Sequence, residues 1–102
     1  MVANAQRRKF ERFPIDCEVE VEIHGRHLHG RLTDVSQGGA FVKLEIEVAV
    51  GDDVLLALED AQKVAAGASV RRVTGDGFAI RFDEETVGRI MAEAARNGDP
   101  HG

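Results

Sequence analysis

The side chains with the clearest chemical potential lie together in residues 7–12, which read RRKFER. This hexapeptide holds four of the chain's 13 lysine and arginine residues, and the rest of the chain has nine basic and 17 acidic residues. Because the whole chain has a net charge of −5, the segment is a compact cationic patch on an anionic body. Such a patch suits a small, doubly charged anion better than a long polyanion, which requires an extended basic surface.

Arg8 and Arg12 are the pair within this patch that could bind one ligand together. Residues four apart share a face if the segment is helical, and they lie on one side if it is extended. Arginine forms bidentate hydrogen bonds with phosphate and stacks on aromatic rings. Two arginines at this spacing are also common on solvated surfaces, so the pair alone leaves both interpretations open.

A second polar group occupies residues 34–39, which read DVSQGG. The carboxylate of Asp34 can accept hydrogen bonds from N–H donors such as the edge of a guanine, and Ser36 offers a short hydroxyl. Gly39 would let the backbone approach a ligand closely, because glycine has no Cβ. An ordinary turn, in which the aspartate and serine side chains bond to the backbone, explains the same residues.

Alternating apolar residues predict six short strands around these groups. The clearest alternation sets an apolar face against an acidic face, Cys17, Val19, Val21 and Ile23 against Glu18, Glu20 and Glu22. The predicted strands cover residues 17–23, 27–35, 40–48, 54–58, 63–73 and 78–82. Short strands separated by turn residues are typical of a small antiparallel barrel or sandwich. Gly67, inside the fifth strand, predicts a bulge or bend there.

The period of the apolar residues changes near the C-terminal end of the sequence. Four of them fall at helical spacing, Val87, Ile90, Met91 and Ala94. This stripe predicts a helix over residues 84–97 that packs against the barrel or against a partner. We expect one domain over residues 7–97, with an arm (7–14), a barrel (15–83) and the helix, between tails at 1–6 and 98–102.

Together, the two motifs and the predicted elements resemble the PilZ domain family of bacterial cyclic di-GMP receptors. The pattern consists of R-x-x-x-R before the first strand, D-x-S-x-x-G at the end of the second strand and a closing hairpin over residues 70–82. The resemblance implies a mainly β fold, a six-stranded antiparallel barrel with a C-terminal helix. It also implies that Arg8 and Arg12 bind cyclic di-GMP. Asp34, Ser36 and Gly39 would surround a guanine.

Three further residues are expected near the same ligand. In this family, an arginine at the position of Arg7 would suit a second, intercalated ligand molecule, although a solvated arginine explains it equally. Gly38 lies inside the second motif. Arg71 and Arg72 follow each other in a predicted strand, where successive side chains point to opposite faces. At most one of these two should therefore reach the ligand, and we favour Arg71.

We expect a non-enzymatic receptor that binds cyclic di-GMP, changes conformation and signals to an unidentified downstream protein. The sequence contains no catalytic constellation and predicts no cofactor. It predicts no metal site either, since His24, His27 and His29 lack a recognised metal-ligand spacing. Two other hypotheses stay open, a PilZ-like protein-interaction module that does not bind the nucleotide and a small barrel that binds nucleic acid. The net charge and the scarcity of aromatic residues count against nucleic acid.

Neither a membrane span nor a targeting segment is evident in the sequence. No apolar run approaches the length of a span, and the N-terminal residues do not resemble a signal peptide. We therefore expect a cytoplasmic protein that does not insert into a membrane. The single cysteine, Cys17, cannot form an internal disulfide, and its place in the alternating strand predicts a small buried hydrophobic residue.

Overall fold

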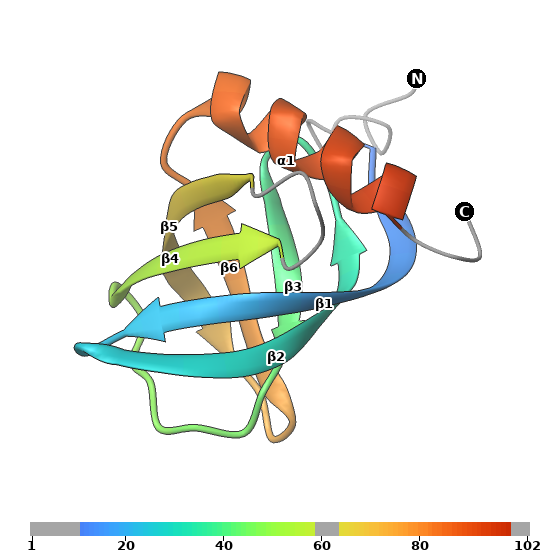
Figure 1. Ribbon diagram of the computed structural model, residues 1–102. Coiled ribbons are helices and arrows are strands. Elements are labelled where there is room, and N and C mark those ends of the chain that lie inside the picture. Colours follow the sequence, from blue (N-terminus) through green and yellow to red (C-terminus); the bar gives the residue numbers. More distant parts are fainter. Residues whose placement is uncertain (1–10, 59–63, 99–102) are drawn as a thin grey trace, which may run out of the picture.

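The structure is a computed structural model that describes residues 11–58 and 64–98. It contains six strands and one helix, β1 (Phe13–Ile23), β2 (Arg26–Val35), β3 (Gly39–Lys43), β4 (Asp53–Leu58), β5 (Ala65–Val73), β6 (Gly77–Phe82) and α1 (Glu85–Gly98). The strands close into an antiparallel barrel in the order β1-β2-β3-β6-β5-β4, and α1 lies across one end of it (Figure 1). The predicted mainly β fold, a six-stranded barrel with a C-terminal helix, is confirmed.

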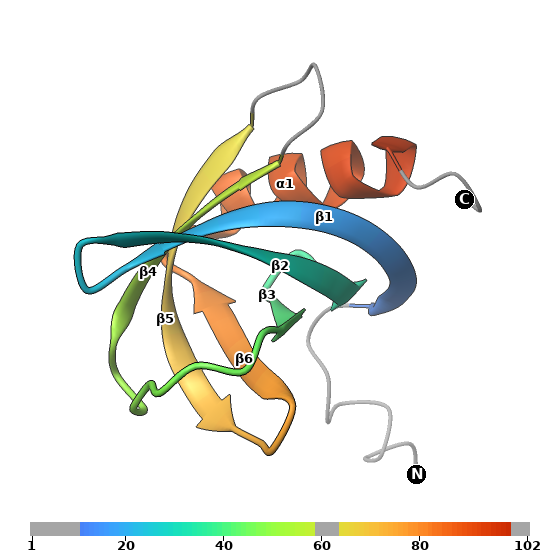
Figure 2. The same cartoon turned by 60° about the horizontal axis from the view of Figure 1, so that its bottom comes forward.

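The core fills the inside of the barrel and continues beneath the helix. Its largest fully buried side chains come from β6, β2, β4 and α1, namely Phe78, Leu32, Leu56 and Met91. Figure 2 shows the barrel from another side, with α1 still packed over the end formed by β1, β5 and β6. No helix in the described part of the chain is long and apolar enough to cross a membrane.

β1 follows the predicted alternation and begins earlier than the sequence indicated. Val19 and Val21 are fully buried, and Cys17 is buried as well, as a small hydrophobic residue would be. The strand starts at Phe13 and includes Pro14, which pairs with Asp34 of β2. β4 pairs with β1 only from Val19 onward, so the beginning of β1 has a partner on one side alone. A proline is tolerated at such an edge because its missing N–H is not needed there.

The predicted length of the third strand is wrong. β3 ends at Lys43, not at residue 48. Leu44, Ile46 and Val48 still pack against the core, so the apolar alternation is real, but the segment has no neighbouring strand. β6 begins at Gly77, which pairs with Lys43. One further hydrogen bond, from the Leu44 N–H to the Asp76 carbonyl oxygen at 3.2 Å, closes the ladder.

The bulge in the fifth strand lies at a different residue from the one predicted. Gly67 pairs regularly with Leu55 of β4, and a Cβ at Gly67 would lie 2.8 Å from a carboxylate oxygen of Asp83. Gly67 therefore provides close approach rather than a bend. The register shift in β5 falls between Val70 and Arg72, which makes Arg71 the extra, bulged residue.

The buried face of α1 is rotated slightly from the predicted stripe. Met91, Ala94 and Ala95 are buried, whereas Ile90 is 48 % exposed. The helix comes close enough to the β2–β3 turn that a Cβ at Gly88 would collide with the backbone carbonyl of Gln37. Gly88 therefore lets α1 lie directly against the backbone of Gln37 in the β2–β3 turn.

Candidate functional site

Of the arginine motif near the N-terminus, the structure describes the last member. Arg7 and Arg8 lie outside the described residues, and Arg12 immediately precedes β1. The pairing of β1 with β2 carries Arg12 to the end of β2, where the second motif begins, because Phe13 pairs with Val35.

Arg12 and Asp34 join the two sequence motifs directly. The Nη2 atom of Arg12 donates a hydrogen bond to Oδ1 of Asp34 at 3.0 Å, and each side chain is 33 % exposed. An ion pair with this much solvent contributes little to folding stability, because water screens it and its side chains lose freedom. The Arg12 guanidinium and the Asp34 carboxylate can therefore give up their ion pair and contact a ligand at a small cost in folding free energy.

Ser36 holds together the turn between β2 and β3. Its hydroxyl accepts hydrogen bonds from the backbone N–H groups of Gly38, at 3.2 Å, and Gly39, at 3.1 Å, and it also contacts the Gly39 carbonyl oxygen at 3.3 Å. The side chain is 8 % exposed, and the Ser36 N–H donates to the same carbonyl. The serine fixes the shape of the turn that borders the site.

Gly39 is required by the packing of two strands. It pairs with Arg81 of β6, and a Cβ at this position would collide with the carbonyl oxygen of Ile80. The N–H of Phe82 donates to the Gly38 carbonyl oxygen at 2.9 Å. The turn is therefore held tightly against β6, next to Arg81.

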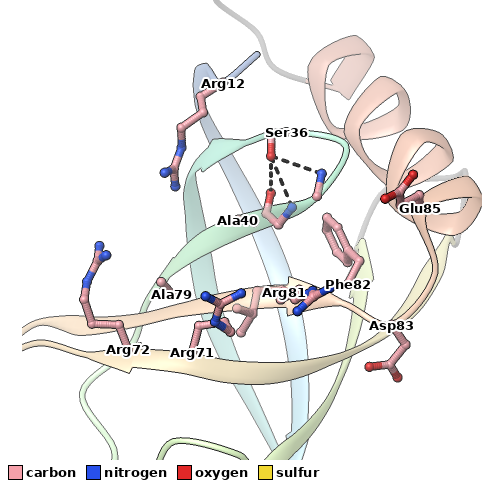
Figure 3. A pocket seen from close by; sticks show the side chains of 13 residues that line it. Arg12, Ser36, Ala40, Arg71, Arg72, Ala79, Arg81, Phe82, Asp83 and Glu85 are labelled. Atoms are coloured by element: carbon pink, nitrogen blue, oxygen red, sulfur yellow. Dashed lines mark hydrogen bonds between the residues drawn. The ribbon is translucent and has the colours of Figure 1, made fainter. Parts of the chain in front are cut away.

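A pocket of about 500 Å³ opens between this turn, the outer surface of β5 and β6, and the start of α1. It is lined by Arg12, Ser36, Gly38, Gly39, Ala40, Arg71, Arg72, Ala79, Ile80, Arg81, Phe82, Asp83 and Glu85 (Figure 3). Of the residues that the sequence placed at the site, Arg12, Ser36, Gly38, Gly39 and Arg71 thus border one cavity.

Asp34 lies in an adjoining hollow of about 360 Å³. Arg12, Pro14, Phe41 and Arg72 line it as well. Arg12 and Arg72 border both cavities, so these two side chains lie between the pocket and the hollow that contains Asp34. Phe41, which the sequence did not single out, adds an aromatic side chain beside that carboxylate.

The bulge in β5 places both Arg71 and Arg72 at the pocket, where the alternation of a regular strand would place only one. Both are exposed and both line the pocket, because the extra residue of a bulge interrupts the alternation of side chains. Arg81 of β6 projects into the same cavity (Figure 3). The sequence analysis favoured Arg71 over Arg72 and did not single out Arg81, since Arg81 looks like an ordinary exposed strand residue.

The pocket is electropositive although the chain is acidic. Four arginines line it beside two carboxylates, Asp83 and Glu85. The Asp83 carboxylate points away from the guanidinium groups (Figure 3), toward Gly67. Arginine favours phosphate and carboxylate groups through its planar set of donors, so the arrangement suits an anionic ligand.

The histidine-rich hairpin lies outside this pocket and forms polar pairs of its own. His24 lies 3.0 Å from Asp52, and His27 lies 4.0 Å from Glu22.

Arg31 pairs with Asp16 at 2.6 Å and with Glu18 at 3.3 Å. The hydrogen bond and the charge of Asp16 raise the pKa of the Arg31 guanidinium above its usual value. Across the described residues, no three His, Cys, Asp or Glu side chains gather closely enough to hold a metal ion.

Comparison with known proteins gives matches in sequence family and in fold. A family model described as the PilZ domain matches residues 6–93. Among curated proteins, no sequence matches the chain.

Three solved structures illustrate the likeness in fold. The PilZ domain of CeSA from a cellulose-synthesising bacterium superposes with a TM-score of 0.69 at 22 % identity, covering 84 % of this chain and 98 % of that one. The PilZ domain of Escherichia coli YcgR, solved with c-di-GMP, gives 0.69 at 16 % identity, covering 90 % and 93 %. The Borreliella burgdorferi PlzA protein in complex with c-di-GMP gives 0.67 at 19 % identity, covering 93 % and 42 %.

Proposed function

The chain belongs to the PilZ domain family, and on this premise we propose that it is a receptor for cyclic di-GMP. The observation that supports the proposal most is the meeting of its two motifs, with Arg12 at 3.0 Å from Asp34 at the rim of a pocket bordered by Ser36 and Gly39. The solved YcgR domain and PlzA, which share the fold, hold this ligand.

The chemistry of the ligand matches the groups that the site offers. Cyclic di-GMP carries two phosphates and two guanines, and arginine can bind the phosphates by charge-assisted hydrogen bonds and the bases by stacking. The carboxylate of Asp34 can accept hydrogen bonds from the N1–H and N2–H groups of a guanine. In this proposal the ligand replaces the Arg12–Asp34 pair, and Arg8 joins Arg12 on the phosphate side.

We assign to the receptor a signalling role without catalysis, in the cytoplasm, with cyclic di-GMP as its ligand and no cofactor. The ligand would bridge the arm that carries Arg8 and Arg12 and the turn at 34–39, so that binding changes the surface presented to a downstream protein. Arm motion on the nanosecond scale, measured by NMR relaxation of the backbone amides, should fall when the ligand binds. Equal arm motion with and without ligand would contradict this mechanism.

The experiment that tests the receptor is calorimetric titration of the purified chain with cyclic di-GMP. We expect saturable binding by the wild type and a loss of at least tenfold in affinity for Arg8→Ala and for Asp34→Ala, because each removes charge-assisted hydrogen bonds. Arg26→Ala removes the same charge from an exposed strand position outside the pocket and should bind like the wild type. A stoichiometry near two ligands per chain would implicate Arg7.

A PilZ-like protein-interaction module that does not bind the nucleotide is the second candidate. One feature favours it: the polar groups of the site are satisfied within the protein, Arg12 by Asp34 and the Ser36 hydroxyl by its own turn. Absence of binding heat and of a thermal shift at high ligand concentration, in a folded wild type, would select this candidate over the receptor.

A further inference from the structure

Three arginines on the barrel strands, Arg71, Arg72 and Arg81, stand apart from the motif residues. We propose that these strand arginines form a second phosphate-binding group. They contact the ligand from the barrel, whereas the arm contacts it from the opposite side. The inference rests on the proposed receptor function and deepens it, because it adds phosphate contacts from residues outside both motifs.

The bulge in β5 is the feature that makes this group possible. Val70 pairs with Ile80 and Arg72 pairs with Ala79, so Arg71 is inserted between two successive pairs of the ladder. In a regular strand, Arg71 and Arg72 would point to opposite faces. With the insertion, both line the same pocket. Bulges often re-aim side chains beside functional sites, and this one adds a second guanidinium to the pocket.

The neighbours of Arg81 leave space above the sheet for a ligand. On β6, Arg81 lies between Gly39 of β3 and Ser69 of β5, its partners in the two ladders. Cross-strand neighbours of this kind lie close enough for their side chains to touch. Gly39 has no side chain, because the Ile80 carbonyl oxygen fills the place of its Cβ, and Ser69 has a very short one. Neither partner therefore carries a side chain that could cover the Arg81 guanidinium, which borders the pocket.

The strand arginines lack the carboxylate partners that Arg12 and Arg31 have. None of the three forms an ion pair with a carboxylate of residues 11–58 or 64–98. Arg12, by contrast, pairs with Asp34, and Arg31 pairs with two acidic residues. Three guanidinium groups on one surface repel one another, and a bound phosphate relieves that repulsion.

The two cavities suggest which arginines contact each phosphate of the ligand. Arg72 borders both cavities together with Arg12, so one phosphate lies between these two residues while a guanine reaches Asp34. Arg71 and Arg81 border only the larger cavity, where they receive the second phosphate. Each of the strand arginines thus contributes to affinity without belonging to either sequence motif.

The test compares single alanine variants of the three strand arginines by calorimetry with cyclic di-GMP. Arg71→Ala, Arg72→Ala and Arg81→Ala should each weaken binding about tenfold. Arg26→Ala and Arg89→Ala, which remove one exposed charge outside the pocket, should leave it unchanged. If only one of Arg71→Ala and Arg72→Ala weakens binding, or if neither does, the bulge does not serve the ligand and the inference is wrong. A wild-type thermal transition in each variant excludes misfolding as the cause.

A second measurement separates this inference from the receptor function. The wild type is titrated with sodium pyrophosphate while the arginine side-chain Nε–Hε resonances are followed by NMR. Shifts of the Arg71, Arg72 and Arg81 resonances, without any binding of cyclic di-GMP, would support the phosphate-binding group and contradict the proposed receptor function. Cyclic di-GMP binding that none of the three variants weakens would support the receptor function and contradict the second phosphate-binding group.

Discussion

At the scale of single residues, the candidate site combines residues that shape the β2–β3 turn with residues that contribute little to folding. Ser36 ties two backbone N–H groups of its turn, and Gly39 allows β3 to approach the Ile80 carbonyl. Arg12 and Asp34 differ from these two, because their ion pair is part-exposed and adds little to folding. Substitutions at these two kinds of position should therefore separate stability from binding.

Arg12→Ala should weaken ligand binding strongly and leave the fold almost intact. We expect a loss of at least about tenfold in affinity and a change below about 1 kcal/mol in the free energy of unfolding. Calorimetry and urea denaturation measure the two quantities. A destabilisation well above 1 kcal/mol would mean that the Arg12–Asp34 pair is chiefly structural.

Ser36→Ala should affect both quantities. Removing the hydroxyl leaves the N–H groups of Gly38 and Gly39 without an acceptor, which costs about 1–2 kcal/mol of stability, and the loosened turn should bind more weakly. Ser69→Ala, a serine to alanine change on β5 outside the pocket, is the matched control for urea denaturation. Equal stability of the two variants would show that the hydroxyl does not hold the turn.

At the scale of elements, α1 is joined to both parts of the site. Its Gly88 packs against the Gln37 carbonyl of the turn, and near its other end the Arg96 guanidinium lies 3.7 Å from the centre of the Phe13 ring. Phe13 follows Arg12 directly, so a displacement of either the turn or the beginning of β1 reaches the helix. In the receptor proposed above, α1 would therefore be the element that conveys ligand binding to the surface.

Gly88→Ala tests this contact. Alanine favours a helix over glycine by about 1 kcal/mol, but its Cβ would collide with the Gln37 carbonyl and lie 2.8 Å from the Phe82 ring. We expect a net destabilisation of about 1–3 kcal/mol and weaker binding, because the helix pushes the turn aside. Thr86→Ala, an exposed position on the same helix, should not destabilise. Stabilisation by Gly88→Ala would show that α1 does not press on the turn.

At the scale of the whole molecule, a cationic depression lies on an acidic barrel. The net charge of −5 repels an anionic ligand at long range, whereas the four arginines of the pocket attract it at short range. The ligand touches the arm, the β2–β3 turn and the outer face of β5 and β6 in our proposal. A ligand that joins so many elements should stabilise the barrel as a unit.

Thermal unfolding should report this stabilisation. At a ligand concentration of one hundred times Kd, the folded state gains about 2.7 kcal/mol, which corresponds to an increase in Tm of roughly 10 °C or more for a chain of this size. Differential scanning calorimetry of the wild type and of Asp34→Ala provides the comparison. An equal shift in both proteins would place the ligand away from Asp34.

The sequence by itself determined the features that depend on local pattern. The alternation of apolar and acidic residues from Cys17 to Ile23 predicted a strand with one buried face, because side chains of a strand point alternately to its two sides. The helical stripe around Met91 dictated the C-terminal helix. The spacing within residues 34–39 and the paired arginines indicated the family and the site, since both motifs lie at the ends of predictable strands.

Only the tertiary structure decided the features that depend on partners distant in the chain. β3 ends at Lys43 because its partner strand β6 begins at Gly77, and Ile90 is exposed because the barrel meets α1 on another face. The bulge at Arg71 exists only in the ladder of β5 with β6, so no local pattern could show that Arg71 and Arg72 share the pocket. Likewise, the contact of Arg12 with Asp34 follows from the pairing of β1 with β2, which brings together residues that are far apart in the sequence.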